Sequence, residues 1–380
     1  MNKIKSVEVL CDGAKAGTLA LVQNQFAAFE YDARWLAEGF SLNPLSLPLE
    51  NKVFTPKWHP FEGLFGVFDD SLPDGWGRLL VDRLLLKEGV DPEEVDALNR
   101  LAIVGSAGMG ALSYRPQHVL PRTGSAMDLD HLANECAKML ATSSSEDLDE
   151  LFRLGGSSGG ARPKVLTSYK GQDWIIKFPS SVDAASIGKI EYDYALCARD
   201  CGIAMAETKL FPSKECEGYF GTRRFDRINL PDGGKKRVHM VSAGGLLETS
   251  HRIPNLDYHQ LMRLTLFLTN SYDEIMKLFR LMCFNVYAHN RDDHAKNFSY
   301  LYDGEACAWK LSPAYDLTYS SSLRGEHATT VNGEGANPTL DDLLAVATRA
   351  GIAKSSAQEA ALEIKEKTLP LLASFNLIKQ

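Results

Sequence analysis

The sequence predicts an α+β fold of two lobes, with a β-rich N-terminal part and a mostly helical C-terminal lobe. Two features of the sequence lead to this prediction. Residues 4–31 and 208–242 consist of short apolar runs separated by turn residues, which is the pattern of antiparallel strands. After Gly244-Gly245 the pattern switches, and apolar residues recur at helical spacing.

The composition is that of an ordinary folded protein, since 44% of the 380 residues are hydrophobic and 24% are charged. This length allows two or three domains, which we expect at 1–120, 121–245 and 246–380. The net charge of −8 argues against a general affinity for nucleic acid. No apolar run is long enough to cross a membrane, and the seven cysteines form no C-x-x-C pair. We expect a cytoplasmic protein with reduced thiols and no signal peptide.

The N-terminal part begins with the expected strands of residues 4–31, which we interpret as a meander. Residues 43–60 are rich in Pro and Leu and are expected to loop across this sheet. Asp74 stands where it can N-cap a helix that Gly89 ends.

Two segments are rich in glycine. Residues 105–110, Gly-Ser-Ala-Gly-Met-Gly, are not followed by Lys-Ser/Thr, so we interpret them as a glycine-eased turn rather than a nucleotide loop. Residues 154–166 place four glycines and two serines before a strand, and such a loop can present backbone N–H groups to phosphates. It is no Walker A motif, and the alternative is a mobile linker. The apolar flanks, together with Arg162 and Lys164, favour the phosphate loop.

A lysine stands in the apolar strand Trp-Ile-Ile-Lys-Phe-Pro, at Lys177. Glu191 follows at the start of an amphipathic helix, which repeats the ion-pair logic that positions ATP phosphates in protein kinases. The alternative is that Glu191 is a solvated helix charge. Met240, Val241 and Ser242 fall, by their order in the chain, where a kinase hinge contacts the adenine edge.

The densest polar cluster of the chain follows an apolar run at 275–286, which we expect to be a buried helix opened by a Ser271 cap. Asp292 and Asn297 lie five residues apart, and Asp316 comes after a hairpin-length gap. Phosphoryl transfer needs this arrangement: Asp292 is then the base, and the other two hold Mg²⁺ against the nucleotide phosphates. The alternative is that these side chains only cap and bridge turns. The kinase interpretation makes the predicted fold a protein-kinase-like one.

The remaining C-terminal elements are regular. We expect a helix at 258–268, a hairpin at 300–311 between the two acidic elements, and a helix from about 341 to 351. A last helix is expected from about 355 to 369, where Pro370 follows.

With the glycine-serine loop, the strand lysine, Asp-x-His-x-Lys-Asn and Tyr-Asp in this order, the chain resembles the HipA family. Leu72-Pro-Asp-Gly-Trp76 is similar to the signature of that family's N-terminal domain. The resemblance extends over nearly the whole chain. It implies a serine/threonine kinase that acts as the toxin of a bacterial toxin–antitoxin pair.

The resemblance assigns roles to matching positions. Asp292 matches the catalytic aspartate, and Asn297 and Asp316 match the metal-binding positions. Ser157, or Ser158 beside it, matches a regulatory autophosphorylated serine whose phosphate expels the loop and silences the kinase. The residues that the resemblance and the chain order assign to ATP are Ser158, Gly159, Gly160, Ala161, Lys177, Met240, Val241, Ser242, His294 and Lys296.

The chain departs from the family at Asp293, where many members have Gly; it is either a turn residue or a change in metal or substrate binding. His294 is expected to brace the loop rather than act as a base. Lys296 either steadies the transferring phosphate or pairs with Asp293.

ATP and Mg²⁺ are the implied cofactors. A HipB-like helix-turn-helix antitoxin is the implied partner, and an aminoacyl-tRNA synthetase is one possible protein substrate. DNA contact is expected mainly through the antitoxin, because Arg223-Arg224 and Lys235-Lys236-Arg237 are better explained as solvated faces than as DNA patches. Two alternatives stay open: a small-molecule kinase of the sugar or aminoglycoside type, and a non-catalytic binding subunit.

Overall fold

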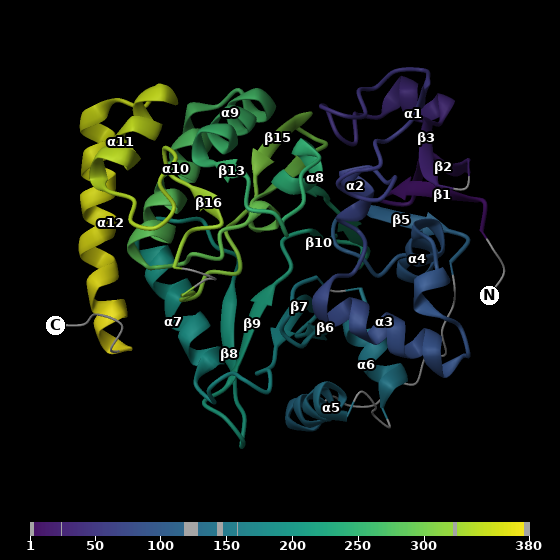
Figure 1. Ribbon diagram of the computed structural model, residues 1–380, viewed down its shortest axis with the longest axis horizontal. Coiled ribbons are helices and arrows are strands. Elements are labelled where there is room, and N and C mark those ends of the chain that lie inside the picture. Colours follow the sequence, from purple (N-terminus) through teal and green to yellow (C-terminus); the bar gives the residue numbers. More distant parts are fainter. Residues whose placement is uncertain are drawn as a thin grey trace. The chain divides into compact units, whose positions relative to one another are not determined.

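The computed structural model describes residues 4–23, 25–117, 128–142, 147–157, 159–321 and 325–375. The chain divides into two compact units, which are described separately (Figure 1). The first unit holds Met1–Gly188, Lys209–Val241 and Gly245–Glu248. The second unit holds Lys189–Thr208, Ser242–Gly244 and Thr249–Gln380.

The first unit begins with a five-stranded antiparallel sheet in the order β4-β3-β2-β1-β5. Its strands are β1 (Ser6–Cys11), β2 (Ala14–Val22), β3 (Phe26–Tyr31), β4 (Val53–Phe54) and β5 (Leu112–Arg115). In β1, Val7 and Val9 are buried while Glu8 between them is exposed, which is the period of a half-buried strand. The meander expected for residues 4–31 is therefore present.

Six helices of the first unit lie between or after these strands. They are α1 (Ala33–Glu38), α2 (Gly66–Asp69), α3 (Gly75–Lys87), α4 (Ala97–Val104), α5 (Leu129–Thr142) and α6 (Leu148–Gly155), with a 3₁₀ turn η1 at Pro92–Glu94. Asp74 is the N-cap residue of α3, as expected, but its side chain makes no capping bond there.

A second sheet of the first unit has the order β6-β7-β9-β8. Its strands are β6 (Lys164–Tyr169), β7 (Gln172–Lys177), β8 (Thr208–Phe211) and β9 (Tyr219–Arg223). Helices α3, α5 and α6 share one apolar core with this sheet, in which Trp76, Leu80 and Trp174 are buried. A helix from residues 75–87 and a strand from residues 172–177 are thus parts of one packed body.

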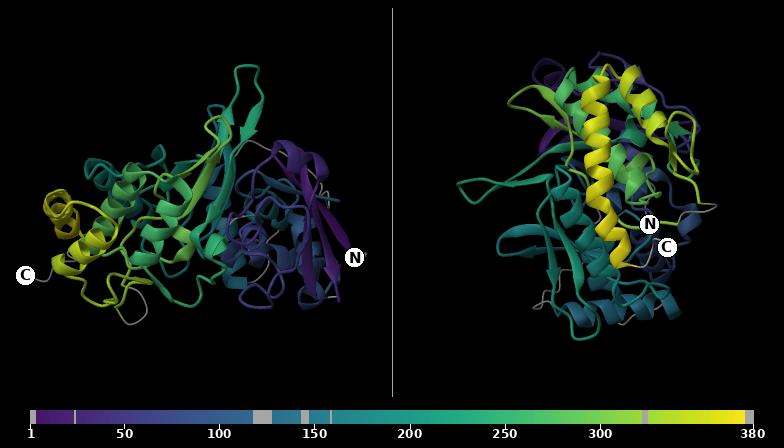
Figure 2. Two further views of the ribbon diagram at one scale, coloured as in Figure 1. Left: turned by 90° about the horizontal axis from the view of Figure 1, so that it is seen from above. Right: turned by 90° about the vertical axis from the view of Figure 1, so that its left-hand side faces the viewer.

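The chain then forms a two-stranded ribbon, β10 (Arg227–Asn229) with β11 (Lys235–Arg237), which projects from its surroundings in both views of Figure 2. Strand β12 (His239–Ser242) and helix α8 (Ala243–Leu247) follow, where the chain passes between the two units.

The second unit is mainly helical. Its helices are α7 (Ile187–Asp200), α9 (Tyr258–Thr269), α10 (Tyr272–Tyr287), α11 (Leu340–Arg349) and α12 (Lys354–Ser374), with a 3₁₀ turn η2 at Ala295–Asn297. Its strands are β13 (Leu256–Asp257), β14 (Ser299–Asp303), β15 (Ala308–Leu311) and β16 (Thr329–Thr330). Strands β14 and β15 form the expected hairpin. Helix α10 is buried over most of its length, and Ser271 caps it as expected.

One helix boundary differs from the expectation. Helix α12, yellow in Figures 1 and 2, does not end before Pro370 but continues to Ser374. Proline removes one backbone hydrogen bond from a helix. Leu371 and Leu372 beyond it are buried, and their packing holds the last turn in helical form.

The predicted α+β class is confirmed, with strands concentrated in the first unit and helices in the second. None of the described helices is long and apolar enough to cross a membrane.

Candidate active site

The Asp292 loop begins directly after α10 in the second unit. Asp292 is exposed, and its backbone carbonyl oxygen accepts a hydrogen bond from Nδ2 of Asn297 at 2.6 Å. Nδ1 of His294 accepts from the backbone N–H of Lys296 at 3.2 Å and caps the η2 turn. The loop is therefore stabilised by its own hydrogen bonds, one of which uses a ring nitrogen of His294.

Asp293, the departure from the family pattern, is fully buried at 0% exposure. Its Oδ2 accepts from the Tyr258 hydroxyl at 2.9 Å and lies 3.0 Å from Nδ1 of His327. Its Oδ1 accepts from the backbone N–H of Thr329 at 3.2 Å. Asn285 donates in turn to the Tyr258 hydroxyl at 2.9 Å. Asp293 thus anchors the loop to α9, α10 and β16.

Tyr315 fixes the second acidic element. Its hydroxyl donates to the carbonyl oxygen of Lys296 at 2.5 Å and lies 2.6 Å from Oγ of Ser299. Asp316, the next residue, has a φ of +58°, a left-handed conformation that few residues other than glycine adopt. Such backbone geometry is concentrated at functional sites, where the surrounding structure holds it. The Tyr-Asp pair is therefore tied to the same loop that carries Asp292.

The glycine-serine loop of the first unit is held by the start of α3. Oδ1 of Asp74 accepts from the N–H of Gly160, and the N–H of Trp76 donates to the carbonyl oxygen of Gly160 at 2.9 Å. Trp76 also donates through Nε1 to Lys164 at 3.2 Å. Gly75 has a φ of +45°, and a Cβ there would lie 2.5 Å from the Gly160 carbonyl oxygen. The residues around Asp74 therefore hold this loop by hydrogen bonds, so it is not a free linker.

Two basic residues flank the loop differently. A Cβ at Gly160 would lie 2.7 Å from Nζ of Lys164, so glycine leaves room for the ammonium beside the loop backbone. Arg162 instead makes two hydrogen bonds with Asp183, each of 3.1 Å. Lys164 rather than Arg162 is therefore the nearer charge for an anion at Gly160.

Ser157 donates through Oγ to the carbonyl oxygen of Ala107 at 3.0 Å, which fastens the loop to residues 105–110. Ser158 lies outside the described residues. Gly159 and Ala161 are exposed.

The remaining predicted residues lie on three elements. Lys177 ends β7, and its Nζ lies 5.7 Å from the ring centroid of Phe220. Glu191 lies on α7 and is only 3% exposed, so it is not a solvated charge. Met240, Val241 and Ser242 form β12, with Val241 and Ser242 buried.

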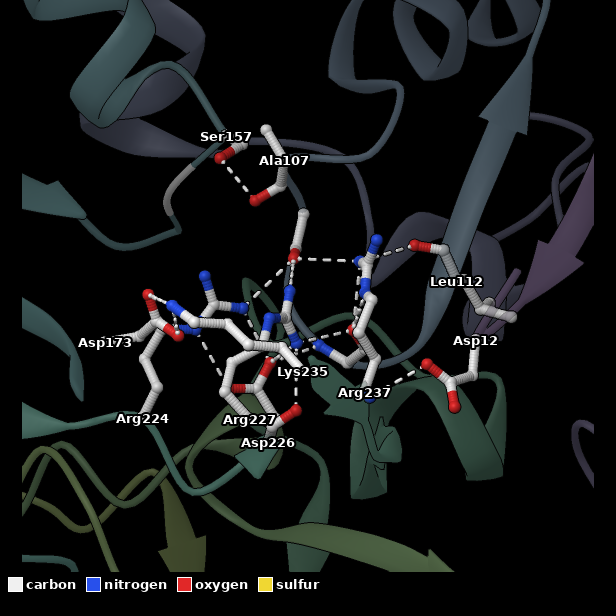
Figure 3. Close-up of polar contacts among 12 residues, drawn as sticks. Asp12, Ala107, Leu112, Ser157, Asp173, Arg224, Asp226, Arg227, Lys235 and Arg237 are labelled. Atoms are coloured by element: carbon white, nitrogen blue, oxygen red, sulfur yellow. Dashed lines mark hydrogen bonds and ion pairs between the residues drawn. The ribbon is translucent and has the colours of Figure 1, made fainter. Parts of the chain in front are cut away.

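Near β10, Arg223 and Lys235 are exposed, as expected, but Arg224 is buried. Arg224 pairs with the fully buried Asp226 through hydrogen bonds of 2.9 and 2.6 Å, and Arg227 pairs with the same carboxylate at 2.7 Å (Figure 3). Burial raises the pKa of Asp226, but the two arginines outweigh burial and hold that pKa below its ordinary value. For Arg227, burial lowers the pKa to about 9.

The same cluster organises the glycine turn at residues 105–110. Arg237 donates to the carbonyl oxygen of Leu112 at 2.9 Å (Figure 3). It also donates to that of Ser106 at 3.0 Å, and Arg224 donates to that of Gly108 at 3.1 Å. A loop that presents carbonyl oxygens cannot cradle phosphate, which agrees with its interpretation as a turn. The expectation that Arg224 and Arg237 belong to solvated faces is wrong, because both side chains make hydrogen bonds within the first unit.

The chain is an α+β protein whose mainly helical unit carries Asp292, Asn297 and the Tyr-Asp pair on one braced framework, and its sequence resembles the HipA family. Comparison with known families agrees. A model of the HipA-like C-terminal domain matches residues 156–370, and a model of the HipA N-terminal domain matches residues 7–115. The chain belongs to the HipA family.

Two relatives extend this comparison. The protein Y4dM of Sinorhizobium fredii, whose name provisionally calls it a kinase, is 23% identical over 387 residues, covering 97% of this chain and 91% of its own. A structure of the HipA, HipB and operator DNA complex of the Shewanella oneidensis MR-1 toxin–antitoxin system aligns with a TM-score of 0.71 at 17% identity. The alignment covers 98% of this chain and 91% of that one. At this identity the match shows a shared fold.

Proposed function

We propose that the protein is an ATP- and Mg²⁺-dependent serine/threonine protein kinase that acts as a toxin. The observation that carries this proposal is the closed loop from Asp292 to Asn297. The hydrogen bond from Nδ2 of Asn297 to the backbone carbonyl oxygen of Asp292 closes the turn that carries both residues. Phosphoryl transfer requires an accessible carboxylate and a metal-binding amide oxygen, which these two side chains offer.

The donor set suits Mg²⁺. Asn297 uses its amide nitrogen within the loop, so its amide oxygen stays available as a ligand, and Asp316 supplies a carboxylate. Mg²⁺ prefers such hard oxygen ligands. The ion would neutralise charge on the nucleotide phosphates when bound.

The glycine-serine loop suits a phosphate chain. Gly160 leaves space that a Cβ would fill, and Nζ of Lys164 borders that space. Backbone amides beside an ammonium attract phosphate oxygens. Lys177, on the same sheet, is proposed as a second cation for ATP, and β12 as the segment that contacts the adenine.

In the transfer step, the hydroxyl of a serine or threonine attacks the γ-phosphorus, its proton passes to Asp292, and ADP leaves. Lys296 and His294 are proposed to lie near the transferred group. Autophosphorylation of Ser157 or Ser158 would place roughly two negative charges in a loop that attracts phosphate, and so oppose ATP binding.

A HipB-like antitoxin is the proposed partner, because the Shewanella relative of this fold assembles with HipB and operator DNA. A protein of the translation machinery, such as an aminoacyl-tRNA synthetase, is the proposed target. The domain limits of 1–120, 121–245 and 246–380 and a cytoplasmic location remain proposals as well.

The test is to incubate the purified chain with Mg·ATP alone and map any phosphate by peptide mass. We expect one phosphate on the peptide that holds Ser157 and Ser158, lost when EDTA removes Mg²⁺. The single variants Ser157→Ala and Ser158→Ala identify the acceptor. Phosphate on neither serine, with ATP turned over only when small hydroxyl compounds are added, would instead identify a small-molecule kinase.

A further inference from the structure

A cavity lies within the second unit. Its volume is about 350 Å³. It is bounded by the end of α10, the chain that follows α10, the segment before α11, and one face of α12. Cavities that bind small molecules begin at about this size.

Four basic side chains line this cavity. Arg291, Lys365, His289 and His327 contribute to it, and none of its lining residues is acidic. Within the described part of the chain, neither Arg291 nor Lys365 has a carboxylate within salt-bridge distance, and the buried Nε of Arg291 has no hydrogen-bond partner. Burial, and then the neighbouring Arg291 and His327, lower the pKa of His289. Arg291 and Lys365 therefore bring to this cavity two positive charges that no carboxylate in the described part of the chain pairs with.

The other side of the cavity is apolar. Val286 from α10, Pro338 before α11, and Leu369 and Leu372 from α12 line it. A fully hydrated inorganic ion would not use this surface, whereas the carbon skeleton of an organic anion would.

We propose that this cavity binds a small organic phosphate. A guanidinium, an ammonium and two imidazoles suit a dianion better than a single carboxylate, and charge-assisted hydrogen bonds to phosphate are among the stronger ones. The apolar wall receives the carbon part. This binding site is independent of the proposed kinase activity, since none of its residues is assigned to the transfer step.

The cavity touches the framework of the Asp292 loop at two points. Arg291 is the residue before Asp292, and His327 reaches Asp293 through Nδ1. Because a carboxylate accepts hydrogen bonds, Nδ1 of His327 carries the proton in this pair, which leaves Nε2 for the ligand.

The test uses glycerol 3-phosphate as the probe and glycerol as its neutral match. Binding is followed by ³¹P NMR line broadening and by the imidazole signals of His289 and His327. In the wild type we expect binding of glycerol 3-phosphate only, and a shift of both imidazole signals because both rings line the cavity.

The variants are Lys365→Glu and Lys365→Gln, with Lys354→Glu as the control. Lys365 and Lys354 are both exposed on α12, so Lys354→Glu changes the net charge equally outside the cavity. We expect Lys365→Glu to raise the Kd by about tenfold or more, Lys365→Gln by less, and Lys354→Glu to leave it unchanged. Equal binding by all variants, no binding at millimolar probe, or binding that leaves both imidazole signals unmoved would overturn the proposal.

Discussion

Asp292 and Asp293 are adjacent carboxylates with opposite surroundings. Asp292 is exposed, whereas Asp293 is fully buried and contacts Tyr258, His327 and Thr329. A buried carboxylate with several partners holds structure, because moving it would leave every partner unpaired. At the residue scale, Asp292 therefore lies at the surface, where we propose that it acts as the base, and Asp293 holds the loop in place.

Tyr258→Phe tests this anchor. The change removes the hydroxyl that joins Asn285 to Asp293, so Nδ2 of Asn285 loses its acceptor and Oδ2 of Asp293 loses one of its hydrogen bonds. We expect a loss of about 1–3 kcal/mol in the free energy of unfolding, measured by urea denaturation. Tyr272→Phe, at a half-exposed position of α10, is the control and should change stability by less than about 0.5 kcal/mol. Equal effects of the two changes would contradict the anchor.

Glu248 gives a pH-dependent prediction. Burial raises its pKa to about 7, although hydrogen bonds from the Gly66 N–H oppose the shift. Between pH 4.5, the ordinary pKa of a glutamate, and pH 7, the folded chain keeps a proton on Glu248 that the unfolded chain has released. The protonated carboxyl therefore contributes its full stabilisation below pH 4.5, and this stabilisation is lost as the pH rises to 7.

We expect Glu248→Gln to remove that pH dependence. Relative to the wild type, the variant should gain stability between pH 4.5 and 7, on the order of 3 kcal/mol across the window. The measurement is the difference in urea midpoint at several pH values. A constant difference between the two proteins would show that Glu248 titrates normally.

At the scale of elements, the local sequence pattern predicts a helix or strand correctly where residues close in the chain determine it. The strands of residues 4–31 follow from alternating burial, and α10 follows from its Ser271 cap and apolar run. The pattern failed at the end of α12, because the buried contacts of Leu371 and Leu372 outweigh the effect of Pro370. Tertiary burial is not visible in a local window.

Pro370→Ala measures that competition directly. Since α12 continues to Ser374, alanine restores a helical hydrogen bond without changing the backbone. We expect the free energy of unfolding to rise by about 1–2 kcal/mol, after allowing for the greater freedom of the unfolded chain. Glu366→Ala, exposed on the same helix, is the control. A loss of stability would mean that the last turn does not form in solution.

The contact between α3 and the glycine-serine loop can be tested by a second substitution at this scale. Asp74→Ala removes the acceptor for the Gly160 N–H but no capping bond of α3. We expect amide exchange at Gly160 to accelerate about fivefold to tenfold while α3 keeps its protection. Asp91→Ala, which uncaps only the η1 turn, is the control. Unchanged exchange at Gly160 would contradict the clamp.

At the scale of the whole molecule, the candidate site consists of side chains that the sequence predicts and of supporting side chains that only the fold brings together. Asp292, Asn297 and Asp316 could be named from residue type and spacing, because phosphoryl transfer demands such groups. Their supports could not be. The partners of Asp293 stand 34 to 36 residues away along the chain, and Asp74 stands 86 residues from Gly160. The Tyr258 and His327 side chains carry no spacing signal that a single sequence reveals.

We propose above all that Asp292 is the base of phosphoryl transfer and that the loop which holds it does not depend on its charge. Asp292→Asn tests it, with intact mass after incubation with Mg·ATP and with ATP affinity measured in parallel. We expect the wild type to gain one phosphate, and the variant to keep its unfolding midpoint and bind ATP but gain none. Phosphate transfer retained by folded Asp292→Asn would contradict the assignment of the base and the account built on it.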